Sequence, residues 1–174
     1  MKIIFLLTFI LQFGSIGIKE KVAETINLFF GEFSTSEQVK YIIPADIRTE
    51  IESECRQRFY RDEVYIWKIR DTEGIESYAL HDNVPGKSQP ITFLVLLGND
   101  LSVKNLEIIK YREPYGGEVA NQDWRKQFVG KSVESEIMVG KDIQSISGAT
   151  ISARSVTIGV KKLVLLMEKI KDQI

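Results

Sequence analysis

The run Ile91-Thr92-Phe93-Leu94-Val95-Leu96-Leu97 decides the fold of this chain. It is apolar at every position except Thr92, and the turn-forming sequence Gly98-Asn99-Asp100 follows it. A short continuous apolar run that ends at a turn is typical of a buried β-strand. We therefore expect residues 91–97 to form a central strand of a sheet.

Further strand signals lie on both sides of this run. Residues 64–69 gather apolar side chains around Trp67, residues 75–80 form a second run, and residues 103–111 follow the turn. Ile137-Met138-Val139 could add a short strand. These segments predict a twisted, mainly antiparallel sheet.

Two helices are predicted before the strands. Residues 19–30 carry apolar residues at helical spacing and stop at Gly31. Residues 46–59 follow Pro44 and place Cys55 on their apolar face, where we expect it to be a buried small hydrophobe.

Two more helices are predicted after the strands. Residues 123–129 suggest a short helix closed by Gly130, whose Trp124 and Phe128 lie on one side, as core anchors or as walls of a ligand site. Residues 151–174 carry the apolar stripe of a long helix. The predicted fold class is therefore α+β, a single domain whose helices pack on the sheet.

The charge and the rare residues exclude several functions. The 174 residues carry a net charge of −1, which argues against a nucleic-acid partner. Cys55 is the only cysteine and His81 the only histidine, so an internal disulfide, a cysteine-ligated cluster and an H-E-x-x-H zinc site are excluded. No metal is expected, and we expect His81 to lie at a strand end or on the surface.

The N-terminus resembles an export signal. Lys2 precedes a short apolar run, and small residues follow at Ser15 and Gly17. We expect residues 1–17 to be a signal peptide or an N-terminal anchor, with residues 18–60 as a helical segment and residues 61–174 as the main domain. The protein would then lie in the periplasm or on the outer face of the cytoplasmic membrane.

The sequence Ser147-Gly148-Ala149-Thr150 precedes the long helix and carries most of the functional information. It places a hydroxyl at the start of a helix, where free N–H groups and the helix dipole favour an anion such as a phosphate. Ser152 is a possible N-cap of this helix. From spacing alone, a turn before a helix is the favoured interpretation of this segment.

Its context distinguishes these two interpretations. Residues 142–152, 86–95, 111–118 and 127–131 together resemble the FMN-binding domain family. The family includes the C subunit of the sodium-pumping NADH:quinone oxidoreductase and the G subunit of the Rnf complex, and the chain is most similar to stand-alone exported members. The resemblance covers roughly residues 60–168, so it assigns residues 61–174 to the FMN-binding domain.

The resemblance implies a covalent flavin. A flavin transferase joins FMN through its phosphate to the threonine of this motif, which is Thr150 here. The transferase would recognise Ser147, Gly148 and Ala149, and these small residues would leave the approach to the threonine hydroxyl open. Ser152 would help to hold the phosphate. Many members carry aspartate three residues before the serine, where this chain has Gln144, and noncovalent FMN is the alternative.

The resemblance also places a second segment near the flavin. Gly116 and Gly117 match a family loop close to the ring, and glycine lets the backbone approach a flat ligand. A tight turn after a strand is the competing interpretation. Tyr115 is a candidate to stack on the ring.

The leading prediction is an extracytoplasmic electron carrier with FMN on Thr150. We expect it to exchange electrons with redox proteins at a membrane, because the chain has no G-x-G-x-x-G fingerprint for a nicotinamide cofactor. No catalytic residues are assigned, so enzyme status stays open. The alternatives are a cofactor-free secreted binding or structural domain and a flavin-dependent reductase of a small substrate.

Overall fold

The computed structural model describes residues 17–31 and 35–174. Its elements are α1 (Ile18–Phe30), β1 (Thr35–Ile42), α2 (Ala45–Cys55), β2 (Glu63–Arg70), β3 (Glu76–Pro85), β4 (Pro90–Leu97), β5 (Val103–Lys110), α3 (Gln122–Arg125) and α4 (Thr150–Ile170). Short 3₁₀ turns η1 (Gly117–Ala120), η2 (Lys126–Phe128) and η3 (Lys171–Gln173) complete the chain. The strands form one antiparallel sheet in the order β1-β2-β3-β4-β5, which confirms the predicted α+β class.

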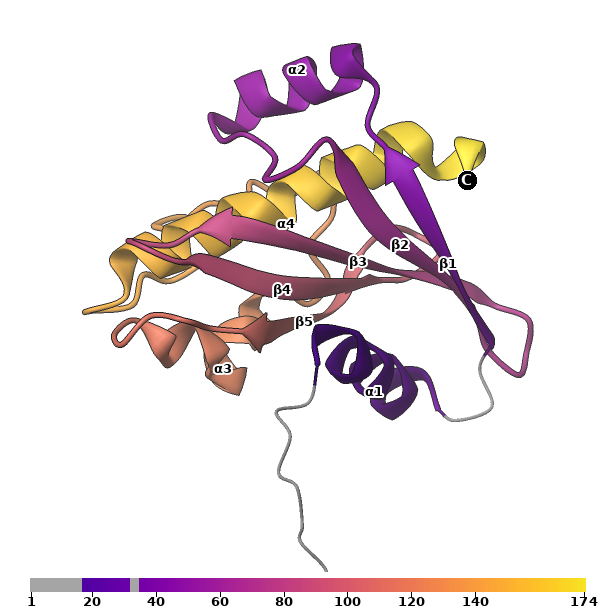
Figure 1. Cartoon of the computed structure of the whole chain (residues 1–174), viewed down its shortest axis with the longest axis horizontal. Helices are drawn as coiled ribbons and strands as arrows, with labels where there is room; N and C mark the ends of the chain where they lie inside the picture. The colour runs from indigo at the N-terminus through magenta and orange to yellow at the C-terminus, as the bar shows by residue number, and fades with distance from the viewer. Residues whose placement is uncertain (1–16, 32–34) are drawn as a thin grey trace, which may run out of the picture.

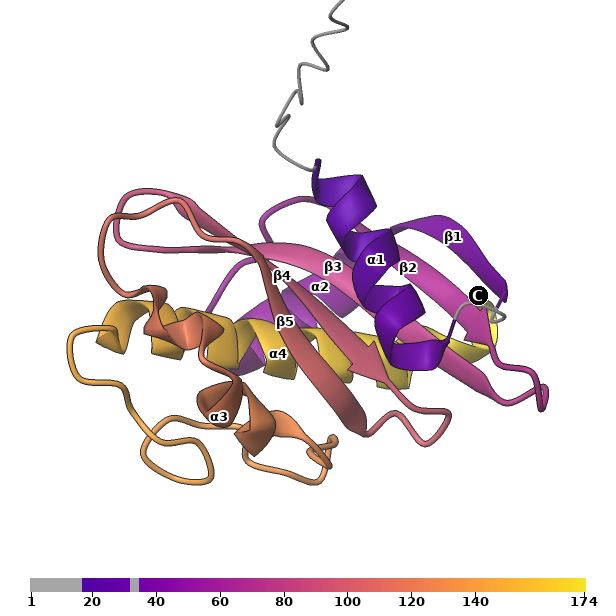
Figure 2. The same cartoon turned by 90° about the horizontal axis from the view of Figure 1, so that it is seen from below.

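Helices cover both faces of the sheet (Figure 1). Helices α2 and α4 lie on one face, and α1 lies on the other, as Figure 2 shows from below. The residues of β4 therefore alternate between two apolar cores. Phe93 and Val95 join the α4 side, and Leu94 and Leu96 join the α1 side. This double burial is the reason why the strand is apolar almost throughout.

Helix α4 crosses the sheet with little space between helix and strands. Gly159 marks the closest approach, because a Cβ atom there would lie 2.6 Å from Val84 Cγ1 and 2.8 Å from Phe93 Cζ. Burial of Val156, Val160 and the apolar residues that follow them fixes this face of the helix against β3 and β4.

A buried lysine adds a polar anchor in the middle of α4. Lys162 Nζ donates to the carbonyl oxygen of Arg58 at 2.7 Å, lies 4.5 Å from the centre of the Phe59 ring, and is 4.0 Å from Asp82 Oδ2. Burial raises the pKa of Asp82 to about 6, although Lys162 opposes this shift. The ammonium thus joins α4 to β3 and to the segment after α2.

Three local predictions differ from the structure. Strand β1 lies inside the segment expected to be helical; it is mostly exposed and is held by its pairing with β2 and by the Lys40–Glu63 ion pair at 2.6 Å. Residues 137–139 form no strand, only a bridge from Val139 to Ile143. Helix α2 ends at Cys55 because Arg56 adopts a left-handed conformation.

The predicted N-terminal signal or anchor, residues 1–17, lies almost entirely outside the described residues. No helix within residues 17–31 and 35–174 combines the length and the apolarity that a membrane span requires.

Replacement of Gly159 by valine tests the contact between α4 and the sheet. We expect Gly159→Val to lower the free energy of unfolding by about 1–3 kcal/mol or more, since a larger side chain must displace Val84 or Phe93. Urea denaturation measures the loss. Glu168→Val, on the exposed side of the same helix, is the control for the β-branched residue. Equal stabilities of the two variants would contradict the close approach.

Candidate functional site

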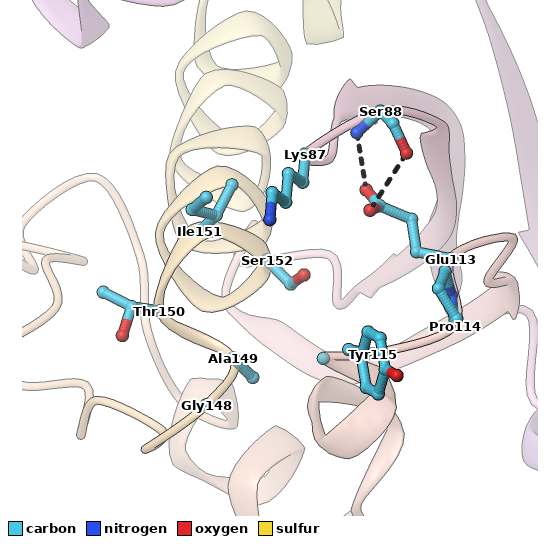
Figure 3. A pocket seen from close by; sticks show the side chains of 11 residues that line it. Lys87, Ser88, Glu113, Pro114, Tyr115, Gly148, Ala149, Thr150, Ile151 and Ser152 are labelled. Carbon is cyan, nitrogen blue, oxygen red and sulfur yellow. Dashed lines mark hydrogen bonds between the residues drawn. The ribbon is translucent and has the colours of Figure 1, made fainter.

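A cleft opens where α4 begins, and we call it the α4 cleft (Figure 3). Its walls are residues 148–152, residues 113–116 of the loop after β5, and residues 87–88 of the turn between β3 and β4. The volume is about 580 Å³. Small-molecule sites typically occupy roughly 300–1,000 Å³, so the cleft is large enough for a ligand.

The N-terminus of α4 forms one wall of the cleft. Ala149 is the N-cap and its side chain caps no N–H group, so the first turn keeps unpaired backbone donors. Gly148 has a φ of +81°, which favours glycine, although a Cβ atom there would meet nothing within 4 Å. Thr150 is exposed, and its hydroxyl makes only a long contact of 3.5 Å to the carbonyl oxygen of Ile146. The threonine is thus accessible for modification beside free N–H groups.

Ser152 is not the N-cap, which corrects the sequence-based expectation. Helix α4 already begins at Thr150, so Ser152 lies inside the first turn and is only 5% exposed. Its Oγ lies 2.9 Å from the hydroxyl oxygen of Tyr111. The residue therefore connects α4 to the loop on the opposite side of the cleft.

Tyr111 holds that loop in place. Its hydroxyl donates to the carbonyl oxygen of Tyr115, so Ser152 is left to donate to the tyrosine oxygen. A Cβ atom on Gly116 would lie 2.5 Å from that oxygen and 2.9 Å from Ser152 Oγ, and the φ of Gly116 is +87°. Packing alone thus requires glycine at position 116. A Cβ atom on Gly117 would meet the Tyr111 ring at an ordinary 3.7 Å.

Glu113 braces the turn between β3 and β4. Its Oε1 accepts the N–H groups of Ser88 and Gln89 at 3.2 and 3.5 Å. Desolvation favours the protonated acid, but these bonds, with others from Ser88 and Lys87, lower the pKa of Glu113 overall. Gly86 is needed beside them, since a Cβ atom there would lie 2.5 Å from the backbone carbonyl oxygen of Gln89 and would also overlap Glu113 Oε1.

The structure brings most of the predicted site residues together. The lining of the α4 cleft includes Tyr115, Gly116, Gly148, Ala149, Thr150 and Ser152. Ser147 and Gly117 do not line it. Tyr115 is 83% exposed, so one face of its ring is open to a ligand or to solvent.

Sequence reasoning assigned no role to Lys87, Ser88 or Glu113, which also line the cleft. The sequence did contain an indication of their role, because these residues lie in residues 86–95 and 111–118, two of the segments that resemble the family. Sequence alone did not show that a glutamate 25 positions from Ser88 closes the turn.

Trp124 and Phe128 are core anchors rather than walls of the cleft. Both are buried, and their rings pack edge to face with centroids 5.1 Å apart. Trp124 Nε1 donates to the carbonyl oxygen of Gln144 at 2.9 Å, and Gln127 Oε1 accepts the Gln144 N–H at 2.8 Å. The backbone of Gln144 is thus fixed while the residue is exposed.

Asp142 has a structural role of its own. Its carboxylate accepts the N–H groups of Ile137 and Met138 at 3.2 and 2.9 Å and pairs with Lys131 at 3.0 Å. Burial opposes ionisation, but these partners together lower the pKa of Asp142. They also hold Ile137 at an unusual φ of +41°, which explains why the predicted strand does not form there. Asp142 is therefore not free to replace an acid at position 144.

The single histidine and the single cysteine of the chain both lie away from the α4 cleft. His81 lies half-buried in the interior of β3, opposite Tyr65 and Leu94, and not at a strand end or on the surface as expected. Burial together with Arg61 and Arg112 lowers its pKa to about 4. Cys55 is buried, and burial raises the pKa of its thiol to about 11. In the part of the chain that the structure describes, no three His, Cys, Asp or Glu side chains are grouped as a metal site requires.

A second cleft of about 820 Å³ runs along α4 on the other side of Thr150. Residues 54–56 and 137–139 line it together with Arg154, Ile158 and other residues of α4. Thr150 thus lies on the ridge between two hollows, so a group attached to it is reachable from both sides.

Comparison with known proteins identifies the type of domain. Residues 86–164 match the family model of the FMN-binding domain, and this range contains every wall of the α4 cleft. The G subunit of the Na⁺-translocating ferredoxin:NAD⁺ oxidoreductase complex of Acetobacterium woodii is 32% identical over 108 residues, which cover 56% of this chain and 51% of that protein. The chain spans about half the length of this relative. Residues 86–164 are thus identified as an FMN-binding domain, and the predicted cofactor, FMN, is confirmed.

The phenol of Tyr111 gives a direct test of the cleft geometry. Tyr111→Phe keeps the ring but loses the bonds to Tyr115 and Ser152, so we expect faster hydrogen exchange at the Gly116 amide and about 1 kcal/mol less stability. Exchange followed by NMR measures the first effect. Tyr41→Phe loses an exposed bond to Gln173 and should leave Gly116 unchanged. Unchanged exchange in Tyr111→Phe would contradict the anchoring role.

Proposed function

We propose that this chain, whose residues 86–164 form a domain of the FMN-binding family, is an exported electron carrier with FMN attached through a phosphoester to Thr150. The observation that carries the proposal is the position of Thr150. Its exposed hydroxyl stands at the uncapped N-terminus of a 21-residue helix and at the edge of a ligand-sized cleft.

The phosphate has suitable surroundings at Thr150. Ester formation replaces the hydroxyl proton with the FMN phosphoryl group and releases the equivalent of one water. The anionic phosphoester then lies beside the free N–H groups of the first turn, where the helix dipole stabilises negative charge. A covalent bond also prevents an exported protein from losing its cofactor.

The loop across the cleft provides the neighbours of the flavin. Tyr115 offers an exposed ring, and Gly116 offers backbone without a side chain. Bound FMN supplies the redox chemistry, and the protein holds it and presents it to partners.

Charge in the cleft favours a carrier over a reductase. Among the described residues that line the α4 cleft, only Lys87 and Glu113 are charged. The Glu113 carboxylate is engaged by the turn between β3 and β4, so it is poorly placed to exchange protons with a substrate. We therefore favour partner proteins as electron donor and acceptor.

The sequence and the relative support export and redox partners. The basic start, apolar run and small residues within residues 1–17 support export to the periplasm or to the outer face of the cytoplasmic membrane. The relative is part of an oxidoreductase complex, which supports exchange of electrons with other redox proteins. A flavin transferase would be required for maturation.

Removal of the hydroxyl tests the attachment. In a host with a flavin transferase, we expect Thr150→Ala to carry no covalent flavin and to keep its fold, because the side chain is exposed. Intact mass and circular dichroism measure the two properties. Thr72→Ala, which loses an exposed threonine hydroxyl in the turn between β2 and β3, should still be modified. Covalent flavin on Thr150→Ala would refute the assignment.

Gln144, three residues before Ser147, gives a second test. Family resemblance places aspartate there, and Asp142 is engaged elsewhere, so we expect Gln144→Asp to be modified several-fold faster than the natural sequence. The initial rate of mass increase at limiting transferase measures this. Ser145→Asp adds the same charge one residue later, at another exposed position, as a control. Equal rates for all three chains would show that the transferase does not read position 144.

A further inference from the structure

We propose that Lys87 binds the phosphate of the flavin from the wall of the α4 cleft opposite the helix. This inference rests on the proposed function, and it adds a residue that no sequence motif singles out. It makes the phosphate site two-sided, with backbone N–H groups of α4 on one side and an ammonium group on the other.

The position of Lys87 is set by a braced turn. Glu113 accepts the backbone N–H groups of Ser88 and Gln89 in this turn, and Gly86 allows its carboxylate to approach. Figure 3 shows the Lys87 side chain extending from this turn toward the first turns of α4. The lysine therefore projects into the cleft from a fixed backbone.

The Lys87 ammonium group has no protein partner within residues 17–31 and 35–174. It makes no hydrogen bond or ion pair there, and the acid that shares its cleft, Glu113, is engaged by the turn. Lys104, by contrast, has an acidic neighbour in Asp100 at 3.4 Å. Lys87 is thus a cation without a protein partner there, and it lines the same cleft as the first turn of α4.

A phosphoester fits this pair of donors. It stays ionised at neutral pH, and its oxygens accept several hydrogen bonds. A lysine binds phosphate as a compact point charge with three donors, and charge-assisted bonds of this kind are stronger than neutral ones. The helix N-terminus and Lys87 together would therefore select a phosphorylated flavin over one that lacks the phosphate.

Arg154 is the competing cation. It lies four residues after Thr150 on the same helix and is exposed, but it lines the second cleft rather than the α4 cleft. A direct comparison of the two cations therefore also tells on which side of Thr150 the phosphate lies.

The test compares FMN with riboflavin, which lacks the phosphate. The full chain is produced without a transferase, and binding is followed by flavin fluorescence for the natural sequence, Lys87→Gln, Lys87→Arg, Arg154→Gln and Lys104→Gln. We expect Lys87→Gln to weaken FMN binding about tenfold, the loss of one charge-assisted bond, with riboflavin unchanged. Lys87→Arg should recover most of the loss, and Lys104→Gln should change neither ligand.

Three results would overturn the inference. The first is an unchanged FMN affinity in Lys87→Gln. The second is an equal loss of affinity for FMN and riboflavin in Lys87→Gln, and the third is a loss of FMN affinity in Arg154→Gln alone. If the unmodified chain binds neither ligand, the ³¹P resonance of the flavinylated protein decides: Lys87→Gln should shift it and Lys104→Gln should not. Absence of any flavin, bound or attached, would contradict the proposed function itself, whereas full attachment with an unmoved resonance would contradict only the role of Lys87.

Discussion

The packing of α4 across the sheet is the contact on which the site depends. Gly159 lets the helix lie directly on Val84 and Phe93, and Lys162 fixes its middle to the carbonyl oxygen of Arg58. A helix of 21 residues held in this way has little freedom at its first turn. Thr150 is therefore presented at a defined edge of the sheet.

The same edge receives the two other walls of the cleft, and short polar contacts join them to the helix. Tyr111 connects the loop after β5 to Ser152, and Glu113 connects that loop to the turn between β3 and β4. The cleft thus exists as a consequence of the fold before any cofactor arrives. Its backbone donors and its lysine then suit a phosphate better than an uncharged ligand.

The sequence predicted the parts of the fold whose apolar pattern follows from burial. Residues 91–97 are buried on both faces, and α4 carries a continuous buried stripe, so both were recognisable. Strand β1 was missed because it is mostly exposed and depends on its partner strand. The N-cap assignment of Ser152 failed because α4 begins two residues earlier, at Thr150, and the Ser152 hydroxyl pairs instead with Tyr111, 41 residues away. The role of Glu113 was hidden for the same reason, since tertiary contacts leave no local pattern. Thr150 stood out through the family resemblance and not through spacing alone.

Intact mass combined with an absorption spectrum, on protein exported from cells that contain a flavin transferase, tests the central claim most directly. We predict a yellow protein that stays yellow after denaturation and carries the mass of FMN less one water on the peptide that contains Thr150. A colourless protein of unmodified mass would contradict this claim, and would leave a cofactor-free binding domain as the better description.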